Sequence, residues 1–136
     1  MTTTAAARLE LAQDVASVGR ARAFVCGLCT EAGLSPDLGD TAALLTSEVV
    51  TNALVHGRSN AVVTARADES GLLVEVGDKD PRPPRPQRTK PQAEALGGRG
   101  LTLVEHLASE WGTYPTATGK VVWFRLHQSS RGATPD

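Results

Sequence analysis

Residues 41–57 read TAALLTSEVVTNALVHG, and their arrangement of polar and apolar side chains is the most informative feature of the sequence. Glu48 is the only residue of this stretch with a permanent charge, and Gly57 marks its end. At about 100° per residue, Asn52 lies about 40° from Glu48 around a helix. The spacing therefore predicts a helix that runs to His56 and places a carboxylate and an amide one turn apart.

We expect this helix to be enclosed, because apolar side chains surround the pair. They fall on both faces of the helix: Leu44, Leu45, Val55, Ala43, Val50 and Ala53. Burial of an unpaired carboxylate costs several kcal/mol, or the group takes up a proton. A Glu48–Asn52 pair there favours contact with a polar group such as a metal ion or a water. Asparagine offers a neutral oxygen to a hard cation, and a carboxylate can accept a proton from a nucleophile.

Two alternatives need no ligand. Glu48 and Asn52 are one turn apart, so they can hydrogen-bond to each other within the core. Glu48 can also pair with an arginine that is distant in sequence. The spacing alone does not choose between these interpretations and a ligand site.

The flanking sequence predicts further helices and strands. A short edge strand at Leu9 and Leu11 precedes a helix from Asp14 to Cys29, and the central helix begins at Asp37 or Asp40 after Gly33 and Pro36 break the chain. After it we expect strands over residues 61–67 and 72–78 joined by a turn at 68–71, a helix over 101–110, and strands over 111–115 and 120–127. This order predicts an α+β fold: a two-layer α/β sandwich whose mixed, mostly antiparallel sheet carries helices on one face.

Composition indicates one globular domain. The chain has 136 residues, 14 basic and 15 acidic side chains, and 40% hydrophobic residues. We expect a domain over residues 8–127 with flexible tails at 1–7 and 128–136. The near-zero charge and 4% aromatic content argue against direct nucleic-acid binding. Because neither a membrane-length apolar run nor a signal peptide is evident, we expect a cytoplasmic protein.

An aspartate, a proline-rich segment and a glycine cluster follow the helix in that order along the chain. Asp78 ends a strand, where a carboxylate can accept hydrogen bonds from a ligand or simply form a turn. Residues 81–91 hold five of the eight prolines and predict a long exposed loop. Gly97, Gly98 and Gly100 precede a helix, where glycines let backbone N–H groups approach phosphate or serve as a hinge. The spacing is not that of a Walker A loop or a dinucleotide fingerprint.

Cys26 and Cys29 form a single CxxC pair within an apolar helical stripe. Zinc binding needs a second pair or nearby histidines, and a redox site needs the pair at a strand-to-helix turn. We therefore interpret both as packing thiols.

In this order, the motifs resemble those of one ATPase superfamily. Residues 48–57, EVVTNALVHG, resemble the N-box shared by gyrase, histidine kinases and the heat-shock chaperone. Residues 78–81 look like its aspartate box and residues 97–104, GGRGLTLV, like its glycine box. Residues 119–124, GKVVWF, resemble the ending of the anti-sigma factor serine/threonine kinases, which have a Bergerat-type ATP-binding fold.

The resemblance implies ATP and Mg²⁺ as cofactors and a role for each motif. Glu48 would be the general base, Asn52 would coordinate Mg²⁺, and Asp78 would receive the adenine amino group. The residues that would approach the nucleotide from the glycine box are Gly97, Gly98, Arg99, Gly100 and Leu101.

The implied function is an ATP-binding regulator that phosphorylates a serine or threonine of an antagonist protein and sequesters a sigma factor. A homodimer is the family's habit. The alternative is a non-catalytic module that docks to partners with or without ATP. This alternative is motivated by residues 79–82, KDPR, which stand where the family's aspartate box usually continues with glycines.

Overall fold

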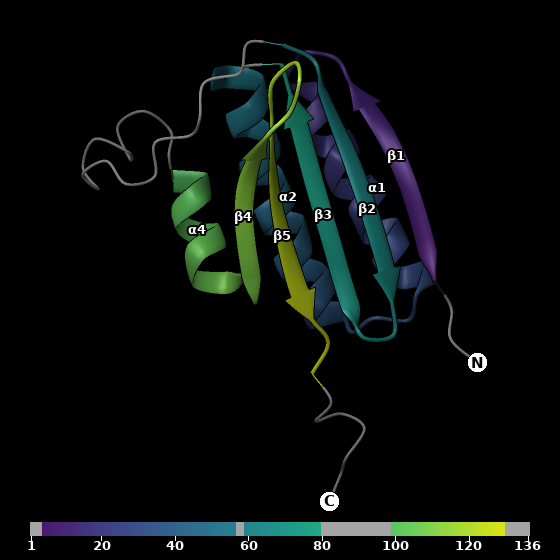
Figure 1. The fold of residues 1–136 in the computed structure, drawn as a ribbon. Helices are drawn as coiled ribbons and strands as arrows, with labels where there is room; N and C mark the ends of the chain where they lie inside the picture. Colours follow the sequence, from purple (N-terminus) through teal and green to yellow (C-terminus); the bar gives the residue numbers. More distant parts are fainter. Residues whose placement is uncertain (1–3, 57–58, 80–98, 130–136) are drawn as a thin grey trace, which may run out of the picture.

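The computed structural model describes residues 4–56, 59–79 and 99–129, which form a helical layer against one antiparallel sheet (Figure 1). The sheet order is β1-β2-β3-β5-β4, and every pairing in it is antiparallel. The elements are β1 (Ala5–Leu11), α1 (Ala16–Glu31), α2 (Pro36–His56), β2 (Ala61–Asp68), β3 (Gly71–Asp78), α4 (Arg99–Leu107), β4 (Glu110–Pro115) and β5 (Lys120–His127). The predicted two-layer α+β sandwich is confirmed.

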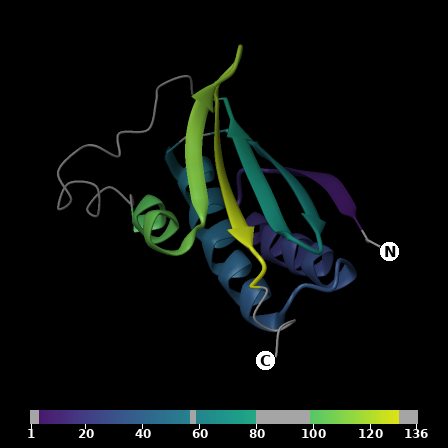
Figure 2. The same cartoon turned by 60° about the horizontal axis from the view of Figure 1, so that its bottom comes forward.

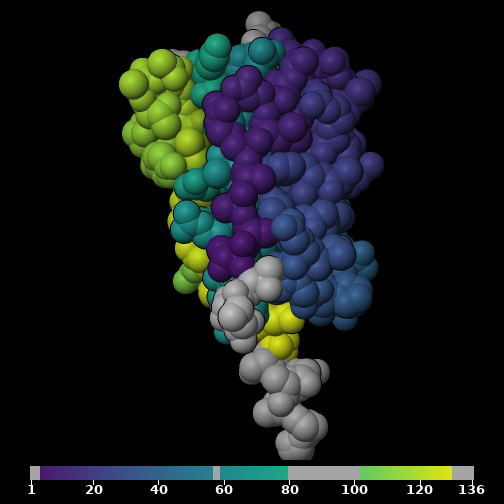
Figure 3. All heavy atoms as spheres, turned by 90° about the vertical axis from the view of Figure 1, so that its right-hand side faces the viewer, coloured from purple at the N-terminus to yellow at the C-terminus, as the bar shows by residue number. Residues whose placement is uncertain are grey.

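The helices cover one face of the sheet, and the core lies between the two layers (Figure 2). Alternate residues of the central strands face the helices, as the period of two requires. Val63, Val74 and Phe124 are fully buried in this interface. Figure 3 looks onto the β1 edge, where the helical layer lies beside the strand. Because side chains alternate between the two faces of a strand, every second residue of β3 and β5 faces the helical layer.

The β2–β3 hairpin forms at the predicted turn. The Asp68 carboxylate accepts hydrogen bonds from Ser70 N at 2.8 Å and from Ser70 Oγ at 2.6 Å, and these bonds lower the pKa of Asp68. Gly71 has a φ of 150°, and a Cβ there would lie 2.1 Å from the carbonyl oxygen of Leu126. Glycine is required here by both conformation and space.

Helix α1 begins two residues after the predicted cap. Asp14 Oδ1 accepts a hydrogen bond from Ser17 N at 3.2 Å, which is the bond expected of a capping side chain. The residue directly before the helix is Val15, and the helix continues to Glu31, past the predicted end at Cys29.

Helix α2 begins at Pro36, not at Asp37 or Asp40 as the sequence predicted. Leu38 N donates a hydrogen bond to Ser35 Oγ at 3.2 Å, so Ser35 caps the helix. Proline is well tolerated at the first helical position because its missing N–H has no partner in that turn. Pro36 therefore starts this helix instead of breaking the chain.

Three other boundaries differ from the prediction. Residues 5–7 pair with β2, so strand β1 includes part of the predicted tail. Helix α4 spans Arg99–Leu107 instead of residues 101–110, because Glu110 already pairs with Arg125 in the β4–β5 ladder. The predicted loop over 81–91 lies outside the described residues. Within the described part of the chain, no helix combines the length and apolar character that crossing a membrane requires.

Cys29 is buried in α1, and its burial, reinforced by neighbouring Cys26, raises the pKa of its thiol to about 11. A thiol that stays protonated is not a redox nucleophile, which agrees with a packing role. The folded-state pKa lies above the ordinary value of 9.0. The thiol's contribution to stability is therefore fully present below pH 9 and is lost as the pH rises toward 11.

We expect Cys29→Ala to remove this pH-dependent loss. The measurement is the urea midpoint of the wild type and the variant at pH 8 and pH 10.5. Tyr114 also has a raised pKa, caused by desolvation and then by Glu75, so both proteins lose some stability. The wild type should lose more than the variant, and equal losses would show that Cys29 does not titrate as described.

Candidate functional site

The row of α2 residues that contains Leu44, Glu48 and Val55 is more exposed than the sequence predicted. Leu44 is 42% exposed, Val55 is 59% exposed, and Glu48 between them is half-buried. The expectation that Glu48 sits in the middle of an enclosed apolar face is therefore wrong. Periodicity gives the residues that share a face, but other elements decide which face is covered. Helix α2 buries Leu45, Val49 and Ala53 instead.

The Glu48 carboxylate makes no hydrogen bond or ion pair with any described residue. Both ligand-free alternatives, a bond to Asn52 or an internal arginine, are absent from this part of the chain. On the neighbouring turn, Arg22 Nη1 donates a hydrogen bond to Ser47 Oγ at 3.2 Å instead. Glu48 is thus a carboxylate within reach of solvent, and it is available to accept a proton from an incoming group.

Asn52 Oδ1 is buried and has no hydrogen-bond partner among the described residues. An unsatisfied buried acceptor costs about 1–3 kcal/mol, so it calls for an explanation. A neutral amide oxygen is a preferred ligand of a hard cation such as Mg²⁺. Asn52 therefore fits the metal role that its position in the N-box implies.

The part of the chain that the structure describes offers few protein ligands for a metal. In residues 4–56, 59–79 and 99–129, no group of three His, Cys, Asp or Glu side chains could hold a metal ion. Mg²⁺ commonly binds through one or two protein oxygens together with substrate phosphates and waters. The donor set of α2 fits a cation carried by a polyphosphate and does not fit an all-protein cage.

Asp78 ends β3 and is buried on the helix-facing side of the sheet. Its Oδ2 pairs with Lys120 Nζ at 3.0 Å, and the side chains are 3% and 12% exposed. The end of β3 and the C-terminal end of α2 lie at the same end of the molecule (Figure 1). Sequence reasoning missed Lys120, although strand parity across the β3–β5 pair was a usable signal.

Only part of the glycine motif is described. Gly97 and Gly98 lie outside the described residues, whereas Arg99, Gly100 and Leu101 form the first turn of α4. Helix α4 packs against α2, so its N-terminus belongs to the same helical layer as Glu48 and Asn52. The free N–H groups of a first turn favour anions such as phosphate.

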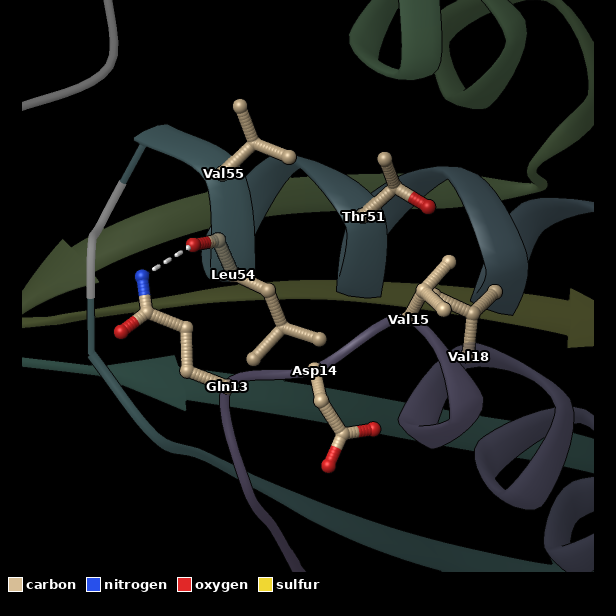
Figure 4. Close-up of a pocket in the computed structure, with 7 residues that line it drawn as sticks. All are labelled: Gln13, Asp14, Val15, Val18, Thr51, Leu54 and Val55. Atoms are coloured by element: carbon tan, nitrogen blue, oxygen red, sulfur yellow. Dashed lines mark hydrogen bonds between the residues drawn. The ribbon is translucent and has the colours of Figure 1, made fainter.

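A groove of about 650 Å³ lies between the start of α1 and the last turns of α2, and the sequence did not predict it (Figure 4). Val15, Val18 and Leu54 form its apolar part, and Gln13 Nε2 donates a hydrogen bond to the Leu54 carbonyl oxygen at 3.0 Å. Thr51 and Val55 form its α2 rim, beside the row that carries Glu48. The groove therefore borders the candidate site.

Comparison with known proteins identifies the family. A histidine kinase-like ATPase domain model matches residues 11–126. The chain belongs to the histidine kinase-like ATPase domain family. Membership indicates an ATP-binding regulatory domain, which agrees with the buried amide of Asn52 and the α4 N-terminus. A search of curated proteins found no match.

Among solved structures, the chain is similar to the histidine kinase domain of a blue-light activated histidine kinase from Erythrobacter litoralis EL346. Sequence identity is 25% and the TM-score is 0.51. The similarity covers 87% of this chain and 62% of the other, so the chain spans less than two thirds of that structure.

Proposed function

We propose that this member of the family is an ATP-dependent protein kinase of the anti-sigma type. It would transfer the γ-phosphoryl group to a serine or threonine of an antagonist protein and would sequester a sigma factor when the antagonist is absent. One observation carries the proposal. Among the described residues, the buried Oδ1 of Asn52 has no hydrogen-bond partner, and it lies one turn along α2 from the half-buried carboxylate of Glu48, which makes no hydrogen bond or ion pair with them.

The residues divide the chemistry between them. Asn52 would hold Mg²⁺, which when bound neutralises charge on the phosphates. Glu48 accepts the proton of the attacking hydroxyl. As that proton leaves, the hydroxyl oxygen bonds to the γ-phosphorus, and the bond between the γ-phosphorus and the oxygen that leaves with ADP breaks. Backbone N–H groups of the first turn of α4 donate hydrogen bonds to phosphate, and the Asp78 carboxylate accepts a hydrogen bond from the amino group of the base.

The exposure of Glu48 favours a protein substrate. A general base must come within hydrogen-bond reach of the proton that it removes. A half-buried carboxylate on an open helix row can meet a side chain presented by another protein. The adjoining groove, with Val15 88% exposed, offers that protein an apolar surface to contact.

The direct test is incubation of the protein with γ-labelled ATP, Mg²⁺ and candidate antagonist proteins. We expect label on serine or threonine of one antagonist, stable to acid. Acid-labile label would indicate transfer to histidine and would contradict the proposal. ATP binding without transfer to any antagonist would also count against it.

The Asp78–Lys120 ion pair favours a second candidate, a non-catalytic docking module of the same fold. A carboxylate that already holds an ammonium group has less capacity for the amino group of a base. Calorimetry with Mg-ATP separates the cases. No binding would favour a module that works without nucleotide, whereas binding without transfer would favour one that holds ATP but does not use it.

A further inference from the structure

The Asp78–Lys120 pair lies where the base of a nucleotide is expected, and it is nearly buried. Its atoms are 3.0 Å apart, and the two side chains are 3% and 12% exposed. Removing two charges from water costs several kcal/mol per ion, which their attraction repays only in good geometry. A contribution to folding stability alone is therefore a weak explanation for a buried ion pair, and we consider what the pair could bind.

The backbone fixes this pair in place. Asp78 and Lys120 are Cα partners in the β3–β5 ladder. Both have the same parity as the buried residues of their strands, which places them on the face toward the helical layer. Directly before Lys120, a Cβ on Gly119 would lie 1.9 Å from the Asp78 carbonyl oxygen, so only glycine fits. Thr116 N donates to Gly119 O at 2.9 Å, and Gly119 N donates to Thr116 Oγ1 at 2.9 Å. The tight turn from Thr116 to Gly119 thus places Lys120 next to Asp78.

The pair presents a different hydrogen-bonding pattern from an aspartate alone. A carboxylate only accepts hydrogen bonds and has about four acceptor sites, whereas an ammonium group only donates, with three N–H bonds. Adenine offers an amino donor beside ring-nitrogen acceptors, and guanine offers the O6 acceptor at the same place. An isolated carboxylate would repel O6, whereas Lys120 can donate to it.

We propose that Lys120 is a specificity-determining residue that lets the site accept guanine as well as adenine nucleotides. Asp78 would accept from the adenine amino group or from guanine N1–H, and Lys120 would donate to an adenine ring nitrogen or to guanine O6. This inference rests on the proposed nucleotide binding at Asp78.

The test compares the dissociation constants of Mg-ATP and Mg-GTP, measured by calorimetry, for the wild type and for Lys120→Met. For the wild type we expect the two constants to agree within about tenfold. In Lys120→Met both bases lose the hydrogen bond from Lys120, but only guanine then places an acceptor, O6, against the Asp78 carboxylate. GTP binding should therefore weaken about 10- to 100-fold more than ATP binding. Lys120→Arg, which keeps a cationic donor, should retain GTP binding.

The controls separate this inference from the proposed function. Arg66→Met removes an exposed cation on β2, where Arg66 is the Cα partner of Leu73 and lies away from Asp78, and it should leave the ATP-to-GTP ratio unchanged. If Lys120→Met fails to fold because the ion pair with Asp78 is lost, Lys120→Gln keeps a hydrogen bond to Asp78. It replaces the charged donor to O6 by a neutral amide N–H, so it should shift the ratio in the same direction by a smaller factor. Wild type that binds neither nucleotide overturns the proposed function. Wild type that binds ATP but rejects GTP by more than about 100-fold, or an unchanged ratio in Lys120→Met and Lys120→Gln, overturns only the role of Lys120.

Discussion

Glu48→Gln is expected to lower the rate of phosphoryl transfer by about 10²–10⁴-fold, the usual contribution of a general base. Glutamine preserves the size and hydrogen-bonding shape of the side chain but cannot take up the hydroxyl proton. Because Glu48 makes no hydrogen bond or ion pair with any described residue, the variant should fold like the wild type. Affinity for Mg-ATP should change little. Single-turnover transfer and calorimetry measure the two quantities separately.

Glu31→Gln is the matched control, because Glu31 is exposed at the end of α1 and lies outside the proposed site. Its transfer rate should equal that of the wild type. Transfer that persists at the wild-type rate in Glu48→Gln would remove Glu48 from the role of base. Equal losses of transfer and of ATP affinity would indicate that Glu48 acts in binding.

Phe124→Ala should destabilise the protein by about 3–5 kcal/mol, the range for removing a buried aromatic side chain. Phe124 is 0% exposed and lies on β5, opposite Val74 of β3 and Trp111 of β4. The helical layer covers it, so the cavity left behind cannot fill with water at low cost. The free energy of unfolding from urea titration checks the value.

Val121→Ala provides the comparison for Phe124→Ala. Val121 is half-buried on the opposite face of β5, so its truncation should cost less than about 1.5 kcal/mol. Similar losses for the two variants would contradict the two-layer arrangement, in which the described helices cover one face of the sheet.

The sequence predicted the architecture because each element carries its own local signal. Alternation in residues 61–67 and 72–78 and the aspartate–glycine turn between them specify a hairpin without reference to the rest of the chain. The helix that begins at Asp37 or Asp40 and runs to His56 carried an equally clear local signal. The start at Pro36 was missed because the cap comes from Ser35, and proline at the first helical position has the same local pattern as a break.

The site was less predictable because it depends on contacts between elements. The pairing of Glu48 and Asn52 along α2 follows from helical spacing alone. The exposure of Glu48 depends on which neighbours cover α2, and a single helix does not encode that. The Asp78–Lys120 pair needs the register of two strands that are 42 residues apart in sequence. Asp78 was named from the sequence, whereas Lys120 was missed, because strand parity indicates the face on which Lys120 lies but not that it stands opposite Asp78.

Asn52 is proposed to hold a magnesium ion carried by a nucleotide. The most direct test is the affinity for ATP measured by calorimetry with Mg²⁺ and with EDTA, in the wild type and in Asn52→Ala. Asn60→Ala, at an exposed asparagine, is the control. We predict that Mg²⁺ strengthens ATP binding to the wild type and to Asn60→Ala, and that Asn52→Ala loses most of this gain, about 10- to 100-fold. An undiminished Mg²⁺ gain in Asn52→Ala would contradict the account.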